Sequence, residues 1–288
     1  MRMRAPSVPL ITVDPYFSLW SPADRLTDTV TRHWTNRPMT FDGTAEIDGV
    51  VYRFMGDKHA DRIPAMAQIA LDVEAFTTTY VFCAGGVELT VLFTTPVMPD
   101  DNYMISRPVS YMEVISRAVD GEEHSVLVKV AVSEQICLHE AGQDTVVAGN
   151  VAIEGIPTAR MGSVSQPILH YSGDDRRIDW GYFYLSVAGG EVGAISREDS
   201  DDGMAYLCAQ VCVEDSALFT FAYDDIESIQ YFGENCRAYW KSQCPSIEAA
   251  IAEAHGDYIA TMERCKCFSD RLFADAVRAG GEKYAELL

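Results

Sequence analysis

The sequence predicts a mainly β protein, a large antiparallel β-sandwich of the supersandwich kind, followed by a short α-helical C-terminal segment. Apolar residues alternate with polar ones in many short runs, and glycine-containing turns separate these runs without helical spacing between them. Such a succession favours antiparallel sheets over a parallel βαβ sheet. After about Ile226 the apolar period changes from 2 to 3.6. We therefore expect a sandwich domain over residues 1–225 and a helical linker over residues 226–288.

The turns define the expected strands in order. Asp48-Gly49 is typical of a two-residue hairpin turn between strands at 44–47 and 50–54. Further runs are separated by turn residues at 84–86, 120–121 and 188–190. The strands predicted from these runs lie at 77–83, 87–94, 111–119, 125–132, 182–187, 205–213 and 217–223.

The C-terminal pattern predicts helices. A short helix is expected over 231–240, and Ser246 is placed as the N-cap of a longer one that runs through Cys265. A further helix is expected from Ser269 or Asp270 to Gly280. The final residues, 282–288, resemble two turns of an amphipathic helix, too short to be stable alone. We expect the chain to be the N-terminal part of a longer protein with a helical continuation; alternatively, Leu287 and Leu288 dock onto the sandwich.

Composition excludes several classes of protein. The net charge of −21 repels phosphate backbones and acidic membrane surfaces, so neither nucleic acid nor membrane is an expected partner. No apolar run reaches the ~18 residues of a transmembrane helix. Residues 1–9 lack the apolar core of a signal peptide, which predicts a cytoplasmic protein, with a secreted or periplasmic one as the alternative. The eight cysteines are expected to be reduced, mostly buried thiols.

No cofactor or metal site is expected. The six histidines form no close metal-binding pair, and there is no P-loop, nucleotide fingerprint or nucleophile elbow. The acidic run at 198–203 could bind calcium, but it lacks the last glutamate of an EF-hand loop.

The densest polar motif spans residues 174–180. Its candidate binding or domain-contact residues are Asp174, Asp175, Arg176, Asp179 and Trp180. Carboxylates, guanidiniums and an indole at this spacing can form ion pairs and a stacked arginine. The motif either lines a polar substrate pocket or ties the sandwich to the next domain, with Arg176 or Arg177 paired to Asp179 or to another loop.

A second candidate region is the aromatic-rich N-terminal segment. Phe17 and Leu19 are expected in the core, whereas Tyr16, Trp20 and Trp34 could bind sugar by stacking or could be core residues. Catalytic residues cannot be assigned from these motifs.

The sequence also resembles the glutaminase A family over essentially its whole length. One matching motif is GDDRRIDWGY at residues 173–182, of which the string from Asp174 to Tyr182 is the most specific element. The other matching motifs lie at 8–21, 31–35, 47–49, 52–56, 106–111, 223–226, 231–233 and 280–285.

The resemblance implies the N-terminal β-sandwich part of a hydrolase that continues into a six-hairpin helical domain and converts L-glutamine to L-glutamate and ammonia. It leaves open an alternative, a carbohydrate-binding or accessory domain of a glycosidase-like protein. On either reading this chain alone is expected to be inactive. Its small-molecule substrate, glutamine or a glycan, would bind only together with the helical domain, and the oligomeric state is open.

Overall fold

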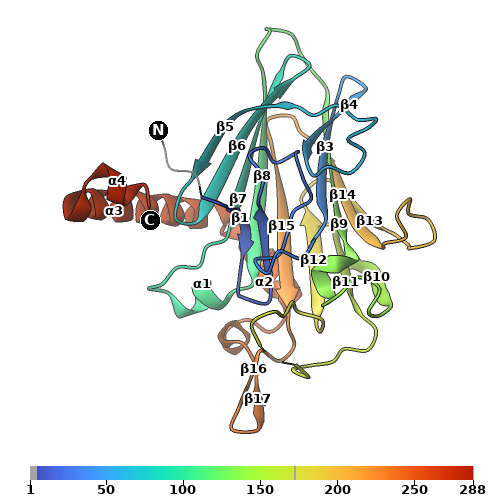
Figure 1. Ribbon diagram of the computed structural model, residues 1–288, viewed down its shortest axis with the longest axis vertical. Helices are drawn as coiled ribbons and strands as arrows, with labels where there is room; N and C mark the ends of the chain where they lie inside the picture. Colours follow the sequence, from blue (N-terminus) through green and yellow to red (C-terminus); the bar gives the residue numbers. More distant parts are fainter. Residues whose placement is uncertain (1–4, 172, 288) are drawn as a thin grey trace.

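Two stacked antiparallel sheets form the body of the protein in the computed structural model, which describes residues 5–171 and 173–287 (Figure 1). The larger sheet has eight strands in the order β10 (Val146–Val151), β11 (Thr158–Ser163), β12 (Tyr182–Val187), β15 (Ser216–Asp224), β8 (Val109–Ala118), β7 (Val87–Thr94), β6 (Thr77–Ala84), β5 (Ala67–Val73). The smaller sheet has five strands in the order β13 (Glu191–Ile195), β14 (Tyr206–Cys212), β9 (Val126–Ser133), β3 (Phe41–Ile47), β4 (Val50–Met55). The predicted mainly β class is confirmed.

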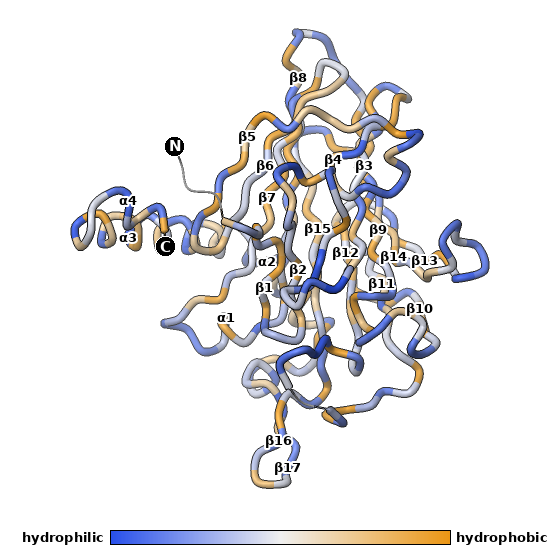
Figure 2. The backbone as a smooth tube through the Cα atoms, viewed as in Figure 1, coloured by the Kyte–Doolittle hydropathy of each residue, from blue (hydrophilic) through white to orange (hydrophobic). Residues whose placement is uncertain are grey.

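The core lies between the two sheets because alternate residues of each strand point inward. Phe41 of the smaller sheet meets Phe221 of the larger one at a ring-centroid distance of 4.9 Å. Figure 2 shows hydrophobic residues along the strands of both sheets, whereas the link between β13 and β14 is hydrophilic. A short pair, β1 (Val8–Thr12) and β2 (Ser18–Ser21), adds to this core, and Phe17 and Leu19 are each 1% exposed as expected.

The predicted strands exist, but not all of the predicted turns are hairpins. Asp48 and Gly49, with φ of 49° and 82°, do connect the paired strands β3 and β4. The links from β8 to β9, β12 to β13 and β14 to β15 instead cross from one sheet to the other. Gly189-Gly190 therefore joins two sheets, because the pairing partner of a strand depends on residues far away in the sequence.

The C-terminal helices differ from the expected pattern in where they break. Helices α2 (Ile247–Gly256) and α3 (Tyr258–Gly280) are separated at Asp257, and no break occurs at Ser269, which is buried within α3. Arg107 fixes the break, since its Nη1 and Nη2 lie 2.6 and 3.1 Å from the two Asp257 carboxylate oxygens. Ser246 caps α2 as predicted.

Helix α2 packs on the outer face of the larger sheet and creates a second apolar core there. This core joins Tyr111 and Ala222 of the sheet to Trp240, Ile251 and Ala254. Helix α3 then extends away from the sandwich (Figure 1). None of the helices in the described part of the chain is both long enough and apolar enough to cross a membrane.

The helix expected over 231–240 is wrong. The segment is a projecting hairpin of β16 (Ile229–Tyr231) and β17 (Glu234–Cys236), followed by a 3-10 turn at Tyr239–Ser242 (Figure 1). Positive φ values at Phe232 (49°) and Gly233 (84°) make the tight turn that a helix cannot contain.

The expectation for the cysteines and the alternative given for Leu287 both need correction. Only Cys137, Cys244 and Cys265 of the eight free cysteines are buried, because strand and helix positions such as Cys212 and Cys267 face outward. The last helix, α4 (Glu282–Ala285), is a single turn, and Leu287, which follows it, is 65% exposed, so the alternative in which Leu287 docks onto the sandwich is wrong. Leu288 and the first four residues fall outside the described residues.

Between β7 and β8 lies the short helix α1 (Asn102–Ser106), and after β9 the 3-10 turn Glu134–Cys137. Asp101 caps α1 by accepting from two backbone N–H groups of its first turn.

Candidate functional site

Most of the predicted site residues meet at one end of the sandwich, which we call the loop end and define by residues 13–17, 32–37, 139–143, 163–171, 173–181 and 224–228. The backbone N–H of Ile178 donates to the Tyr16 carbonyl at 3.0 Å. The Tyr16 and Trp180 rings lie 6.2 Å apart. Trp34 Nε1 donates to the Pro15 carbonyl at 2.6 Å. The two regions singled out in the sequence are therefore one structural unit.

Arg177 is the centre of the polar contacts at the loop end. Its side chain is buried, and Nη1 lies 2.8 Å from Asp175 Oδ1 and 3.0 Å from Thr35 Oγ1. Its Nε donates to the His139 carbonyl at 2.8 Å. The hydrogen bond from Arg177 holds the pKa of the exposed Asp175 carboxyl below its usual range. One guanidinium thus joins three separate loops.

The expected pairing of an arginine with Asp179 is not present. Asp179 is buried and accepts from Gln143 Nε2 at 2.9 Å, and its carbonyl accepts from Ser163 Oγ at 2.7 Å. Arg176 instead lies over the Tyr171 ring at 4.3 Å, and Asp174 is exposed.

Trp180 is 4% exposed, as expected, and anchors the loop to the segment after β15. Its Nε1 donates to the Glu227 carbonyl at 3.1 Å, and its own carbonyl accepts from Tyr223 Oη at 2.9 Å. The next residue, Gly181, has φ of +77°, and a Cβ there would lie 2.1 Å from the Asp224 carbonyl. Only glycine allows this close approach.

Trp20 and Trp34 flank a shallow cavity of about 350 Å³ at the loop end, whereas Tyr16 does not line it. Trp34 is 49% exposed, and Trp20 Nε1 donates to Ser18 Oγ at 3.1 Å. The cavity also contains Asp14, and burial raises the pKa of its carboxyl.

His33 is a loop-end residue that sequence reasoning did not select as a site. It is 1% exposed, and burial together with the nearby Arg177 charge lowers its pKa to about 4. Its Nδ1 lies 2.9 Å from Thr35 Oγ1. His33 and Thr35 are placed like a base and a nucleophile. A histidine with so low a pKa is a weak base, however, and the Thr35 hydroxyl already accepts a hydrogen bond from Arg177. A lone histidine between an arginine and a tryptophan carries no signal in the sequence that would reveal this position.

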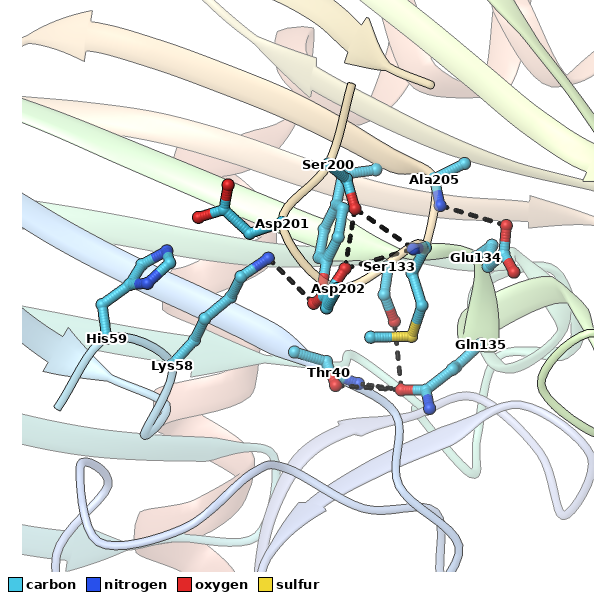
Figure 3. Close-up of polar contacts among 12 residues, drawn as sticks. Thr40, Lys58, His59, Ser133, Glu134, Gln135, Ser200, Asp201, Asp202 and Ala205 are labelled. Carbon is cyan, nitrogen blue, oxygen red and sulfur yellow. Dashed lines mark hydrogen bonds and ion pairs between the residues drawn. The ribbon is translucent and has the colours of Figure 1, made fainter. Parts of the chain in front are cut away.

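A second hollow, which sequence reasoning missed, lies on the outer face of the smaller sheet. Its volume is about 540 Å³, and it is bordered by the loop after β4 and the acidic loop between β13 and β14. Figure 3 shows Lys58 reaching from the first loop toward Asp202 of the second, at 3.0 Å. The hollow brings together residues distant in sequence, so no local motif marks it.

The acidic loop has the wrong partners for a calcium site. Asp202 lies against Lys58 and accepts from Tyr206 Oη at 2.6 Å. Although burial raises the pKa of Asp202, hydrogen bonds from Tyr206, Ser200 and Lys58 hold it well below its usual range. Among residues 5–171 and 173–287, no group of three or more His, Cys, Asp or Glu side chains is placed to hold a metal ion.

Comparison with known proteins adds two family matches. The domain of unknown function DUF5127 matches residues 77–211 and 194–275, and the domain of unknown function DUF4964 matches residues 1–67.

A curated relative and a solved structure are also similar to the chain. Glutaminase A of Aspergillus oryzae (strain ATCC 42149 / RIB 40) is 24% identical over 98% of this chain and 46% of its own length. A putative kojibiose phosphorylase from human microbiome aligns with 98% of this chain and 34% of its own, with 8% identity and a TM-score of 0.37. The chain thus spans about half the length of the curated relative it matches.

Proposed function

The chain belongs to the DUF5127 family and is a glutaminase A-like N-terminal region; from this premise we propose that it is the non-catalytic β-sandwich part of a hydrolase. The reaction proposed for the whole protein is hydrolysis of L-glutamine to L-glutamate and ammonia. The observation that carries the proposal is the match to Glutaminase A, which takes in 98% of this chain but only 46% of the relative.

The polar groups of the loop end support a non-catalytic role. Arg177 and Asp179 have protein partners for their charged groups, and His33 is a weak base. Groups that are already paired within the fold are poor nucleophiles and general bases. A catalytic nucleophile or base needs an unoccupied lone pair, and a base also needs a pKa near the pH at which the enzyme works. Their arrangement instead stiffens one end of the sandwich, on which a helical catalytic region would pack.

The test compares this chain with a longer protein that joins it to the remainder of a glutaminase A-like sequence. Ammonia release from L-glutamine is expected only from the longer protein. Turnover by this chain alone at about 1 s⁻¹ or faster, an ordinary enzyme rate, would overturn the proposal.

A second candidate function is carbohydrate binding, and the cavity between Trp20 and Trp34 favours it. A half-exposed indole beside a carboxyl group can stack on a sugar ring and bind its hydroxyls. Titration with mono- and oligosaccharides, followed by tryptophan fluorescence, is the measurement. Binding should be lost in Trp34→Ala and kept in Tyr239→Ala, a control at a comparably exposed aromatic residue.

A further inference from the structure

The hollow on the smaller sheet, which we call the sheet groove, crosses four strands. Strand pairing places Gly193, Cys208, Ala131 and Asp42 side by side in one row on β13, β14, β9 and β3. The first three have short side chains and form the floor, and Asp42 closes one end. Since neighbouring strands lie ~4.8 Å apart, the row is ~14 Å long.

Longer side chains on the flanking rows form the walls of the sheet groove. Glu191, Gln210, Lys129 and Thr44 pair across the strands on one side. Gln210 Nε2 donates to Glu191 Oε2 at 2.9 Å, which leaves acceptor capacity on that carboxylate. The groove is therefore an elongated space with a carboxylate at each end of its length.

Asp42 is the unusual group of the sheet groove. Its Oδ2 is buried and, within the described residues, has no hydrogen-bond partner. Burial raises the pKa of Asp42 to about 7; Lys58 and Arg53 oppose the shift, and Asp57 and Asp202 add to it. A buried carboxylate oxygen without a donor is costly, so a ligand that donates to Asp42 Oδ2 gains free energy.

Lys58 does not fill this role, because it is engaged elsewhere. Its Nζ lies 3.0 Å from Asp202 Oδ2 and 3.9 Å from the centroid of the Tyr206 ring. Lys129, the other cation of the groove, pairs with Glu46 at 3.2 Å. The unmatched charge in the groove is therefore negative.

These features indicate which class of ligand fits the sheet groove. An anion would meet unpaired carboxylates in a protein of net charge −21. A glycan would find no stacking surface, since Tyr206 is 2% exposed and covered by Lys58. A flexible aliphatic chain fits the small-residue floor, and an ammonium group at each end matches the two carboxylates.

We propose that the sheet groove binds a linear aliphatic polyamine, with one terminal ammonium donating to Asp42 and the other to Glu191. The proposal concerns a different surface from the loop end and does not depend on the glutaminase-like function.

The first test is calorimetric titration of the protein with spermidine, with 1,8-octanediol as an uncharged chain. Spermidine binding is expected to weaken tenfold or more in Asp42→Asn, because the charge-assisted hydrogen bond is lost. Asp100→Asn is the matched control, since it removes the same charge at an exposed position before α1 and should change affinity little. Equal weakening in both variants would indicate nonspecific attraction to an acidic protein and overturn the proposal, as would absent spermidine binding or equal binding of the diol.

The second test blocks the floor without touching a charge. Gly193 has open space around a built Cβ and no positive φ, so Gly193→Leu should fold and abolish spermidine binding. Gly149→Leu on β10 is the matched control, with equally open surroundings in the other sheet. If Gly193→Leu binds spermidine as the unchanged protein does, the groove is not the site. This result decides the question even if Asp42→Asn fails to fold.

A third readout follows from the protonation of Asp42. Spermidine should bind about tenfold more tightly at pH 8 than at pH 6, with proton release near pH 7, because the ammonium favours the ionised carboxylate. Affinity independent of pH, with no proton release, would contradict an ammonium contact at Asp42.

Discussion

The loop end and the sheet groove each contain a charged side chain that is largely removed from water, Arg177 and Asp42, and the two differ in how that side chain is partnered. At the loop end the guanidinium of Arg177 is fully engaged, with Asp175 in its own loop and with Thr35 and His139 in two others. In the sheet groove, Asp42 is left with an oxygen that has no partner. The difference separates a charged group that holds the fold together from one that is available to a ligand.

Arg177→Ala should show the largest effect on stability, and it tests directly whether the loop end holds the fold together. Its removal leaves a cavity and deprives the His139 carbonyl of a donor, at a cost of about 3–4 kcal/mol. Thermal or urea unfolding measures this cost. A free energy of unfolding within about 0.5 kcal/mol of the unchanged protein would show that the loop end is not a structural tie.

Acidification should destabilise the loop end through His33. The pKa of His33 falls from 6.5 in the unfolded chain to about 4 in the folded one, so the unfolded state binds the proton more readily. Stability is therefore fully present above pH 6.5 and is lost by about 2–3 kcal/mol as the pH falls to 4. His33→Gln should reduce this slope in urea unfolding at several pH values; an unchanged slope would rule out His33 as its source.

The sheet groove should respond to pH with the opposite sign. The pKa of Asp42 rises from 3.8 to about 7 on folding, so the folded state binds the proton more readily between these values. Stability from this group falls by about 2 kcal/mol as the pH rises from 5 to 7. Asp42→Asn removes the titration, and its stability relative to the unchanged protein should increase over that range. A constant difference between the two proteins would mean that Asp42 has an ordinary pKa.

Arg176→Ala should show the smallest effect on stability. Because Arg176 is adjacent to Arg177, it serves as the matched comparison for Arg177→Ala. The sequence analysis allowed Arg176 to be the arginine that pairs with a carboxylate, and losing a buried pair of that kind would cost about 1–3 kcal/mol. In the structure Arg176 stacks on the half-exposed Tyr171, so the expected change in unfolding free energy is within about 0.5 kcal/mol. A loss comparable to that of Arg177→Ala would show that both arginines tie the loop.

Sequence reasoning found the loop end in part, because its residues form local motifs. The string 173–182 and the segment around Tyr16 are dense in aromatic and charged residues, which made them visible. The sequence could not predict that these two segments contact each other, or that His33 is buried at the loop end, because the segments are far apart in the chain. The choice of Asp175 over Asp179 as the partner of Arg177 depends on loop geometry.

Four features could be predicted from the sequence alone: the mainly β class, the alternating inward faces of the strands, the N-cap at Ser246 and the resemblance to the glutaminase A family. These follow from local periodicity, local hydrogen bonding and contiguous motifs. Three features became known only from the three-dimensional structure. They are the turns that cross between the sheets, the helix break at Asp257, and the groove lined by Asp42, Ala131, Cys208 and Gly193. Each of these depends on contacts between residues far apart in the sequence. A short stretch of sequence does not show which distant residues will pair or how much free energy that pairing contributes.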